Sequence, residues 1–240
     1  MIEEGKRMRT FLIAAAAVLI ASPAAGATRN FGIEGFTKVR VDGPYKVQLA
    51  TGVAPFAKAE GSAAALDKVA IEIVGSTLVV HPNRSSWGGY PGQDSGAVVI
   101  SLGTHELTGA WVNGSGMLAI DKVKALIFDL SVQGSGAASI DRTAVDQLRL
   151  SLSGTAYVTL AGEAGKVTAT VRGMSSVDAS QLRIKDAALS AEGSATIKAS
   201  VSNSAKIDGS GPATFALTGG ASCVARLSGS ATLSGCKTTQ

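Results

Sequence analysis

A Gly-Ser-Gly-like triplet recurs through the second half of the sequence at an interval of about twenty residues. The triplets begin at Gly114, Gly134, Gly154, Gly173, Gly193, Gly209 and Gly229, with steps of 20, 20, 19, 20, 16 and 20 residues. A nearly fixed interval of this size means that one structural unit is stacked repeatedly. The repeat therefore constrains the architecture strongly and says little about chemistry.

Apolar and polar residues alternate on both sides of the triplets, as they do in strands, and a helical period is absent. Residues 148–152 (Leu-Arg-Leu-Ser-Leu) are one such segment. Two all-β architectures fit. In an antiparallel meander the interval would be incidental, whereas in a parallel β-helix equivalent positions stack about 4.8 Å apart. The repeat favours the β-helix, and an aromatic content of only 5% suits its narrow interior.

The triplets are expected to be the corners of this β-helix, because a tight corner needs glycine for positive φ or close backbone approach. Their hydroxyl residues then form a ladder of Ser115, Ser135, Thr155, Ser194, Ser210 and Ser230, interrupted by Met174. We interpret this ladder as structural repetition. Specific function is expected where the period breaks: the aromatic loop before the first triplet, the 16-residue step and the two-cysteine end.

The region before the triplets carries strand signals at residues 38–42, 45–49, 69–73, 77–81 and 97–102, and residues 62–68 predict a short helical turn. Residues 28–240 are therefore expected to form one β-helical domain, with triplet rungs from about 112 to 236. A mature chain of this length buries one substantial core, which makes a single domain the default.

The N-terminus has the pattern of a secretory signal peptide. Basic residues precede an unbroken apolar run at residues 11–21, and Ala25-Gly26-Ala27 is an A-x-A cleavage site. The run is shorter than the roughly 20 apolar residues that span a bilayer. We predict cleavage after Ala27, which makes residues 1–27 the signal peptide. No later segment is long and apolar enough to cross a membrane, so export to the periplasm, the cell surface or the medium is expected.

Cleavage would leave a weakly basic chain. Removing Lys6, Arg7, Arg9, Glu3 and Glu4 from 22 basic and 18 acidic residues leaves 19 and 16, a net charge of +3. This charge is too small and too evenly spread to indicate nucleic acid binding.

The two cysteines, Cys223 and Cys236, lie close to the C-terminus. In an exported protein a pair of this kind predicts a disulfide, which would fasten the last rung. Two buried free thiols are the alternative. A zinc site is not expected, because the chain has no further cysteine and both histidines lie far upstream.

The loop at residues 83–95 is the one long loop with aromatic residues. Trp87 and Tyr90 flank two glycines, with Arg84 and Asp94 nearby. Exposed rings stack on sugar faces and anchor interfaces, so these four residues are the candidate binding site. An ordinary loop whose Trp packs on the body is the alternative reading.

Other motifs indicate no catalysis, metal or cofactor. His81 and His105 have no evident nucleophile or orienting carboxylate. Asp121 and Asp141 repeat at the rung interval, but the next rung has Ala161-Gly162, so they are interpreted as turn residues rather than a carboxylate ladder. Calcium-binding nonapeptides are absent. The chain is therefore expected not to be an enzyme and to need no cofactor.

Several segments resemble the DUF2807 family, described as auto-transporter adhesin head GIN domains. They include "FTKVRVDGPYKVQLATG", "LDKVAIEIVGSTLVVHP", "NGSGMLAI", "QGSGAASI" and "SGSATLSGC", and the likeness covers about residues 33–236. The resemblance implies a single-stranded right-handed parallel β-helix and an adhesin role, and it transfers no catalytic residues. The family often has Asp after Gly-Ser-Gly, where this sequence has Met117, Ala137 and Tyr157.

The expected function is that of an exported, non-enzymatic binding module of adhesin type, with a cell-surface glycan or an envelope protein as partner. A periplasmic scaffold or sensor without adhesion is the alternative, and a polysaccharide-active enzyme is a third.

Overall fold

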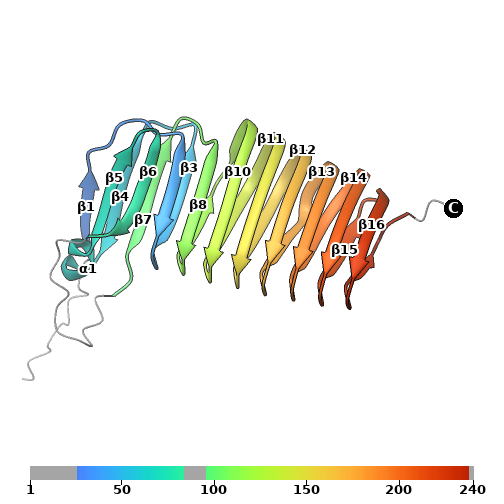
Figure 1. Ribbon diagram of the computed structural model, residues 1–240. Coiled ribbons are helices and arrows are strands. Elements are labelled where there is room, and N and C mark those ends of the chain that lie inside the picture. The colour runs from blue at the N-terminus through green and yellow to red at the C-terminus, as the bar shows by residue number, and fades with distance from the viewer. Residues whose placement is uncertain (1–25, 84–95, 238–240) are drawn as a thin grey trace, which may run out of the picture.

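The computed structural model describes residues 26–83 and 96–237, and nearly all of them lie in strands. The chain winds into an elongated solenoid of about six turns, with α1 at one end and β16 near the other (Figure 1). The elements are β1 (Ala27–Phe31), β2 (Lys38–Asp42), β3 (Lys46–Thr51), β4 (Phe56–Gly61), α1 (Ala63–Asp67), β5 (Val69–Val74), β6 (Thr77–Pro82), β7 (Val99–Thr104), β8 (Gly109–Gly114), β9 (Met117–Ile120), β10 (Val123–Gly134), β11 (Ala137–Gly154), β12 (Tyr157–Arg172), β13 (Ser176–Glu192), β14 (Thr196–Ser210), β15 (Thr214–Thr218), β16 (Ser222–Ser228) and β17 (Thr232–Ser234). The predicted β-solenoid with rungs of about twenty residues is confirmed. Within the described ranges, no helix has the length and apolar character needed to cross a bilayer.

Each coil has three flanks, named here by their place relative to the corner glycine. In β11, residues 137–140 form the post-corner flank, residues 143–147 the third flank and residues 148–153 the pre-corner flank. Side chains alternate between the interior and solvent along each flank, as the sequence pattern predicts. The buried ones in this coil are Ala138, Ile140, Thr143, Val145, Leu148, Leu150 and Leu152.

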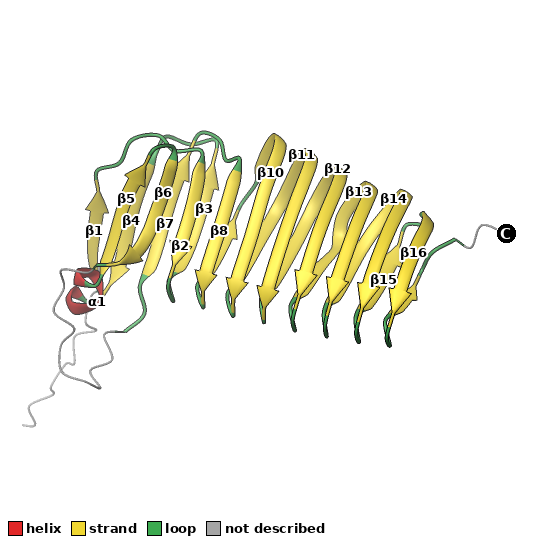
Figure 2. Cartoon of the chain, viewed as in Figure 1, coloured by secondary structure: helices red, strands yellow, loops and turns green. Residues whose placement is uncertain are grey.

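Successive coils pair as parallel strands, so that equivalent residues lie directly above one another (Figure 2). One inward column on the pre-corner flank consists of Leu130, Leu150, Ala169, Leu189 and Ile207, all of them buried. The core is therefore a stack of apolar columns that runs the length of the solenoid.

The triplet glycines are the corners of this stack. The first five corner glycines have φ between +79° and +102°: Gly114, Gly134, Gly154, Gly173 and Gly193. The amide of Ser135 donates to the carbonyl of Gly114 at 3.0 Å, and that of Thr155 donates to Gly134 at 2.8 Å. A Cβ added at Gly154 would lie 2.4 Å from the carbonyl oxygen of Gly134. Both requirements for glycine, positive φ and close approach, are thus met at one position.

The prediction that Gly209 begins the sixth corner is wrong. Gly211, with φ of +76°, forms this corner, whereas Gly209 is buried inside β14. The last two steps are therefore 18 and 18 residues rather than 16 and 20, and Pro212 takes the hydroxyl position assigned to Ser210. Register decides the choice, because Thr214 pairs with Thr196. Gly209 is needed for another reason: an added Cβ would lie 2.7 Å from the ring of Phe215.

The N-terminal end is closed by α1, at the place where a helical turn was predicted. Ser62 caps the helix, its hydroxyl accepting the amide of Ala65 at 3.1 Å. Leu66 is only 2% exposed and belongs to the core. Arg29 on β1 fastens the helix by donating to the carbonyl of Leu66 at 3.0 Å and by pairing with Asp67 at 2.6 Å. The antiparallel strands β1, β4 and β5 surround this end.

At the other end, Cys223 and Cys236 form the predicted disulfide, with their Cα atoms 5.7 Å apart. The bond joins β16 to the residues that follow β17, and so ties the last coil together.

Stacking at the corners yields a test with a matched control. Gly75 has φ of +62° but open space around it, so Gly75→Ala should cost only the left-handed backbone penalty, about 1 kcal/mol. Gly154→Ala adds the collision with Gly134 and should cost about 1–3 kcal/mol more. Urea denaturation of both variants measures the difference. Equal losses would contradict close stacking at the corner.

Candidate binding site

The loop predicted to bind, with Arg84, Trp87, Tyr90 and Asp94, lies outside the described residues, so the structure does not test it. The chain enters it beside α1: the backbone amide of Asn83 donates to the carbonyl of Lys68 at 2.8 Å, and its side-chain amide donates to the backbone carbonyl of Asp67 at 3.1 Å. The assignment of these residues to binding stays a prediction. Two hollows on the flanks of the solenoid provide further candidates.

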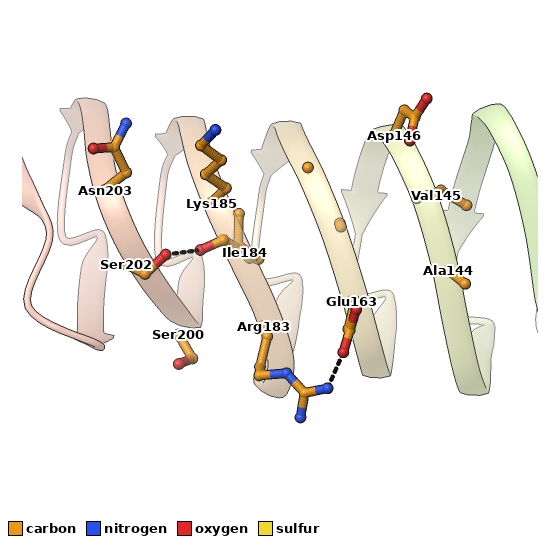
Figure 3. A pocket seen from close by; sticks show the side chains of 12 residues that line it. Ala144, Val145, Asp146, Glu163, Arg183, Ile184, Lys185, Ser200, Ser202 and Asn203 are labelled. Atoms are coloured by element: carbon orange, nitrogen blue, oxygen red, sulfur yellow. Dashed lines mark hydrogen bonds and ion pairs between the residues drawn. The ribbon is translucent and has the colours of Figure 1, made fainter.

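The first hollow is a groove on the third flank that crosses β11 to β14, with a volume of about 860 Å³ (Figure 3). Gly165 lies between Asp146 on the preceding coil and Lys185 on the next coil. Because glycine has no side chain, it leaves open space at this point of the groove. The coils approach closely here, since an added Cβ at Gly165 would lie 2.8 Å from the carbonyl oxygen of Asp146.

The polar groups around this groove mainly join one coil to another. Arg183 forms an ion pair with Glu163 on the preceding coil (Figure 3). Asn203, which lines the groove, donates to Asp186 at 2.7 Å, and Ser204 donates to the same carboxylate at 2.5 Å. The bond from Ser204, followed by that from Asn203, lowers the pKa of Asp186. These contacts stabilise the stack, which is a sufficient reason for their presence.

The second hollow lies on the post-corner flank and is called the aromatic trough. It consists of two adjoining depressions of about 390 and 210 Å³ that share Gln48 and Ala119. Its floor is made of small residues on neighbouring strands: Ala50, Ser101, Ala119, Ala137 and Ser139. Larger side chains stand at its ends, Phe56 at one and Met117 with Tyr157 at the other.

Phe56 lies at one end because of a glycine on the neighbouring strand. Phe56 on β4 pairs with Gly103 on β7, and a Cβ added at Gly103 would lie 2.3 Å from the Phe56 ring. The ring therefore covers the glycine, as aromatic residues do in sheets. It remains 42% exposed, which leaves much of its surface for a ligand.

The other end is a slot over Ala137. Met117, Ala137 and Tyr157 are in register on β9, β11 and β12. Met117 is 53% exposed and Tyr157 is 46% exposed, so two large side chains flank one small residue. These are the three positions at which the sequence lacks the Asp that often follows Gly-Ser-Gly in the family that it resembles. Met117 and Tyr157 are two strand spacings apart, about 9.6 Å between their backbones, with Ala137 between them.

The trough is long and carries free polar groups. From Phe56 to Tyr157 the sheet runs β4, β7, β3, β9, β11 and β12, which is about 24 Å at a strand spacing of about 4.8 Å. The side chains of Gln48, Ser139 and Thr159 point outward along it, and none has a hydrogen-bond partner among the described residues. They are therefore available to a ligand.

Of the remaining polar motifs, Asp121 and His81 have structural partners, whereas Asp141, predicted to be a turn residue, lies within β11. Asp121, at the edge of the trough, accepts the amides of Thr51 at 3.0 Å and Lys122 at 2.6 Å, as expected of a turn residue. His81 corrects an expectation: it does have a carboxylate partner, because antiparallel pairing of β5 with β6 brings Glu72 to within 3.1 Å of its ring. Across residues 26–83 and 96–237, no group of three His, Cys, Asp or Glu side chains is placed to hold a metal ion.

Sequence reasoning missed the trough. Phe56 and Gly103 are 47 positions apart, and antiparallel pairing of β4 with β7 brings them together. Tyr157 carried the one usable signal, because it breaks the family pattern directly after a triplet. The exposed rings distinguish the trough from the groove. Phe56 covers Gly103, but the exposure of Met117 and Tyr157 has no evident packing reason, whereas Glu163 and Arg183 in the groove are paired with each other.

The architecture defines the chain as a β-solenoid protein with an open aromatic trough on one flank. Comparison with known families makes this assignment specific. The profile of DUF2807, "Putative auto-transporter adhesin, head GIN domain", matches residues 35–221. This span is most of the sequence, and the chain belongs to the DUF2807 family. No curated protein matches it significantly.

Solved structures share the fold. A "putative adhesin" from Bacteroides fragilis has a TM-score of 0.76 at 17% identity, covering 88% of this chain and 97% of its own. A "putative lipid binding protein" from Parabacteroides distasonis has a TM-score of 0.69 at 18% identity, covering 88% and 96%. A "putative adhesin" from Parabacteroides merdae has 0.69 at 13%, covering 88% and 95%. At these identities the likeness establishes the fold, and the family makes the chain an adhesin-like protein.

The Asp186 contacts predict a pH dependence. Because the folded state lowers this pKa, the stabilisation is present above the unfolded-state pKa and is lost as pH falls through the folded-state pKa. Asp186→Asn should therefore lower the urea midpoint at pH 6, and the two midpoints should converge as the pH is lowered to about 2. A difference that stayed constant with pH would show that the charge of Asp186 contributes nothing.

Proposed function

We propose that the protein is an exported, non-enzymatic module of adhesin type that binds an extended cell-surface glycan in the aromatic trough. The observation that carries this proposal is the pair of exposed rings, Phe56 and Tyr157, at the two ends of a floor of small residues. An envelope protein is the alternative partner, and a scaffold or sensor without adhesion is the alternative role.

A glycan suits the trough for three physical reasons. Sugar rings have apolar faces that stack on aromatic side chains, and Phe56 and Tyr157 present such surfaces. Hydroxyl groups need partners when they leave water, and Gln48, Ser139 and Thr159 can supply them. The spacing also fits, since a pyranose ring is about as wide as one strand spacing. The solenoid holds all these groups rigidly, so little conformational entropy is lost on binding.

Binding without hydrolysis is supported by the carboxylates near the trough. A glycosidase places two carboxyl groups on either side of the scissile bond, one as acid and one as base or nucleophile. Asp121 and Asp141 both border the trough, but Asp121 is engaged by two backbone amides. We therefore expect no release of reducing ends from a bound glycan.

Export is supported by the signal-like N-terminus and by the disulfide, a bond typical of oxidising compartments. The predicted cleavage after Ala27 is compatible with the fold. It would remove only the first residue of β1, and residues 28–31 would keep their pairing with β4.

Binding can be tested with the mature chain on an array of bacterial and host-surface glycans, followed by titration of the strongest ligand. Tyr157→Ala should weaken binding about tenfold, the loss of one stacking ring, or about 1.4 kcal/mol. Met174→Ala is the matched control, because Met174 is 68% exposed but lies at a corner and does not line the trough.

Three results would contradict the trough as the site. Equal affinity of the two variants would remove Tyr157 from it. Loss of binding only in Trp87→Ala and Tyr90→Ala would place the site in the loop. Binding to phospholipid vesicles but to no glycan would change the ligand class to lipid, which the apolar side chains of Met117 and Phe56 could also accept.

Localisation separates an adhesin from a periplasmic scaffold. The purified protein should begin at Thr28, and protease added to intact cells should degrade it while a periplasmic marker survives. N-terminal sequencing and immunoblotting measure these outcomes. Complete protection in intact cells, with degradation only after the envelope is opened, would contradict surface adhesion.

A further inference from the structure

The C-terminal end of the solenoid exposes its interior. On β16, Cys223, Ala225 and Leu227 continue the inward columns of the preceding coil, where Ala205 and Ile207 are buried. Leu227 is nevertheless 41% exposed, and Ala225 is exposed as well. In the part of the chain that the structure describes, no element covers them. An apolar core therefore ends in an open cross-section.

The backbone of the same end is an open edge. β16 pairs with β14 on one side, and on its other side only Ser222 has a partner, the bridge to Lys237. Between Cys223 and Ser228, the outer edge has no strand partner among the described residues. A row of unpaired amides and carbonyls of this kind is a template for another strand, and solenoids normally need a cap at such a place.

The N-terminal end is different. β5 is the first strand on the same flank and also has one free edge, since it pairs only with β6. Behind it, however, α1 fills the end of the core with Leu66 and Ala65, both buried. Stacking another solenoid on this end would gain little apolar burial. The C-terminal end is the one where association would cover exposed core.

We infer that two copies of this chain join through their C-terminal ends, with the two β16 strands paired antiparallel about a two-fold axis at Ala225. This pairing places inward residues opposite inward residues: Ala225 faces Ala225 of the other copy, and Cys223 faces Leu227. The apolar cross-sections of the two solenoids then cover each other. The inference is independent of any ligand and goes beyond the proposed function.

The charges and the ends of the strand are compatible with this register. Arg226 is the one charged residue of β16; it lies opposite Val224 of the second copy rather than opposite itself, and Asp208 of its own chain is directly beside it. Val224, now 69% exposed, becomes covered. Lys237 stands over Ser222 and limits the new ladder to residues 223–227. A second copy therefore matches the edge in the polarity of its side chains and in length.

A two-fold interface uses the same surface on both partners and so closes at a dimer. Such a dimer carries two aromatic troughs on one rigid body. Two linked sites can raise the effective affinity for a repetitive surface by about 10²–10⁴ without any new contact to the ligand.

The test is the mass of the mature chain, measured by light scattering and sedimentation over a range of concentrations. We expect a dimer at micromolar concentration. Ala225→Lys places two ammonium groups against each other on the axis and should weaken the dimer by more than about 100-fold. Ala144→Lys, an exposed position in the middle of the solenoid, should remain dimeric. Circular dichroism should show that both variants are folded.

A second variant tests the register without depending on disruption. In Ala225→Cys the two new thiols would face each other across the axis, within the range in which disulfides form. Oxidation should give a covalent dimer that Ala144→Cys does not give. Truncation after Lys237 should leave the dimer unchanged.

Three outcomes would overturn the inference. The first is a monomer at all concentrations up to about 100 µM. The second is a full-length monomer that dimerises only after truncation, because the last three residues would then occupy the edge. The third is growth into long assemblies, which would indicate head-to-tail stacking of β16 on β5.

Discussion

Direct stacking of one backbone corner on the next is the constraint on which the rest of the molecule depends. At three successive corners an amide donates to the carbonyl of the glycine one coil earlier: Ser135 to Gly114, Thr155 to Gly134 and Met174 to Gly154. No Cβ can enter this contact, so the glycine is required by the neighbouring coil as well as by its own φ. Once the corners are aligned, every other residue is fixed in a column, either inside the core or outside on a flank.

This arrangement determines where binding can occur. A flank of a regular solenoid is nearly flat, and a hollow forms only where small residues follow one another across strands. The third-flank groove forms around Gly165, and the ion pair between Glu163 and Arg183 joins two of the coils that line it. The aromatic trough forms over alanines and serines, and its ends are exposed rings that serve no evident packing purpose beyond covering Gly103. The trough is therefore the more informative of the two surfaces.

Most of the fold could be predicted from the sequence, because it is periodic. The triplet interval and the alternating strands led to the parallel β-helix, the cysteine pair to the disulfide, and Asp121 to a turn. The sixth corner was predicted wrongly, since Gly209 and Gly211 both suit a corner locally and only the pairing of Thr196 with Thr214 distinguishes them. The local sequence pattern does not determine which residues of one coil pair with which residues of the preceding coil.

The candidate site was less accessible for a related reason. The predicted loop around Trp87 and Tyr90 was chosen because its aromatic residues are adjacent in sequence. In the trough, Phe56, Met117 and Tyr157 come from three distant segments, and only the sheet order of β4, β7, β3, β9, β11 and β12 brings them to one flank. The sequence spacing of these three residues does not show that they lie together. That would require knowing which side chains of each strand point inward and which point outward.

The central claim is that the trough between Phe56 and Tyr157 binds the ligand, and the methionines allow a direct measurement. The sequence contains four, and cleavage after Ala27 would leave only Met117, in the trough, and Met174, at a corner. With both methyl groups labelled for NMR, titration with the bound glycan should shift the Met117 signal and leave the Met174 signal in place. A Met117 signal that does not move under saturating glycan would contradict the account.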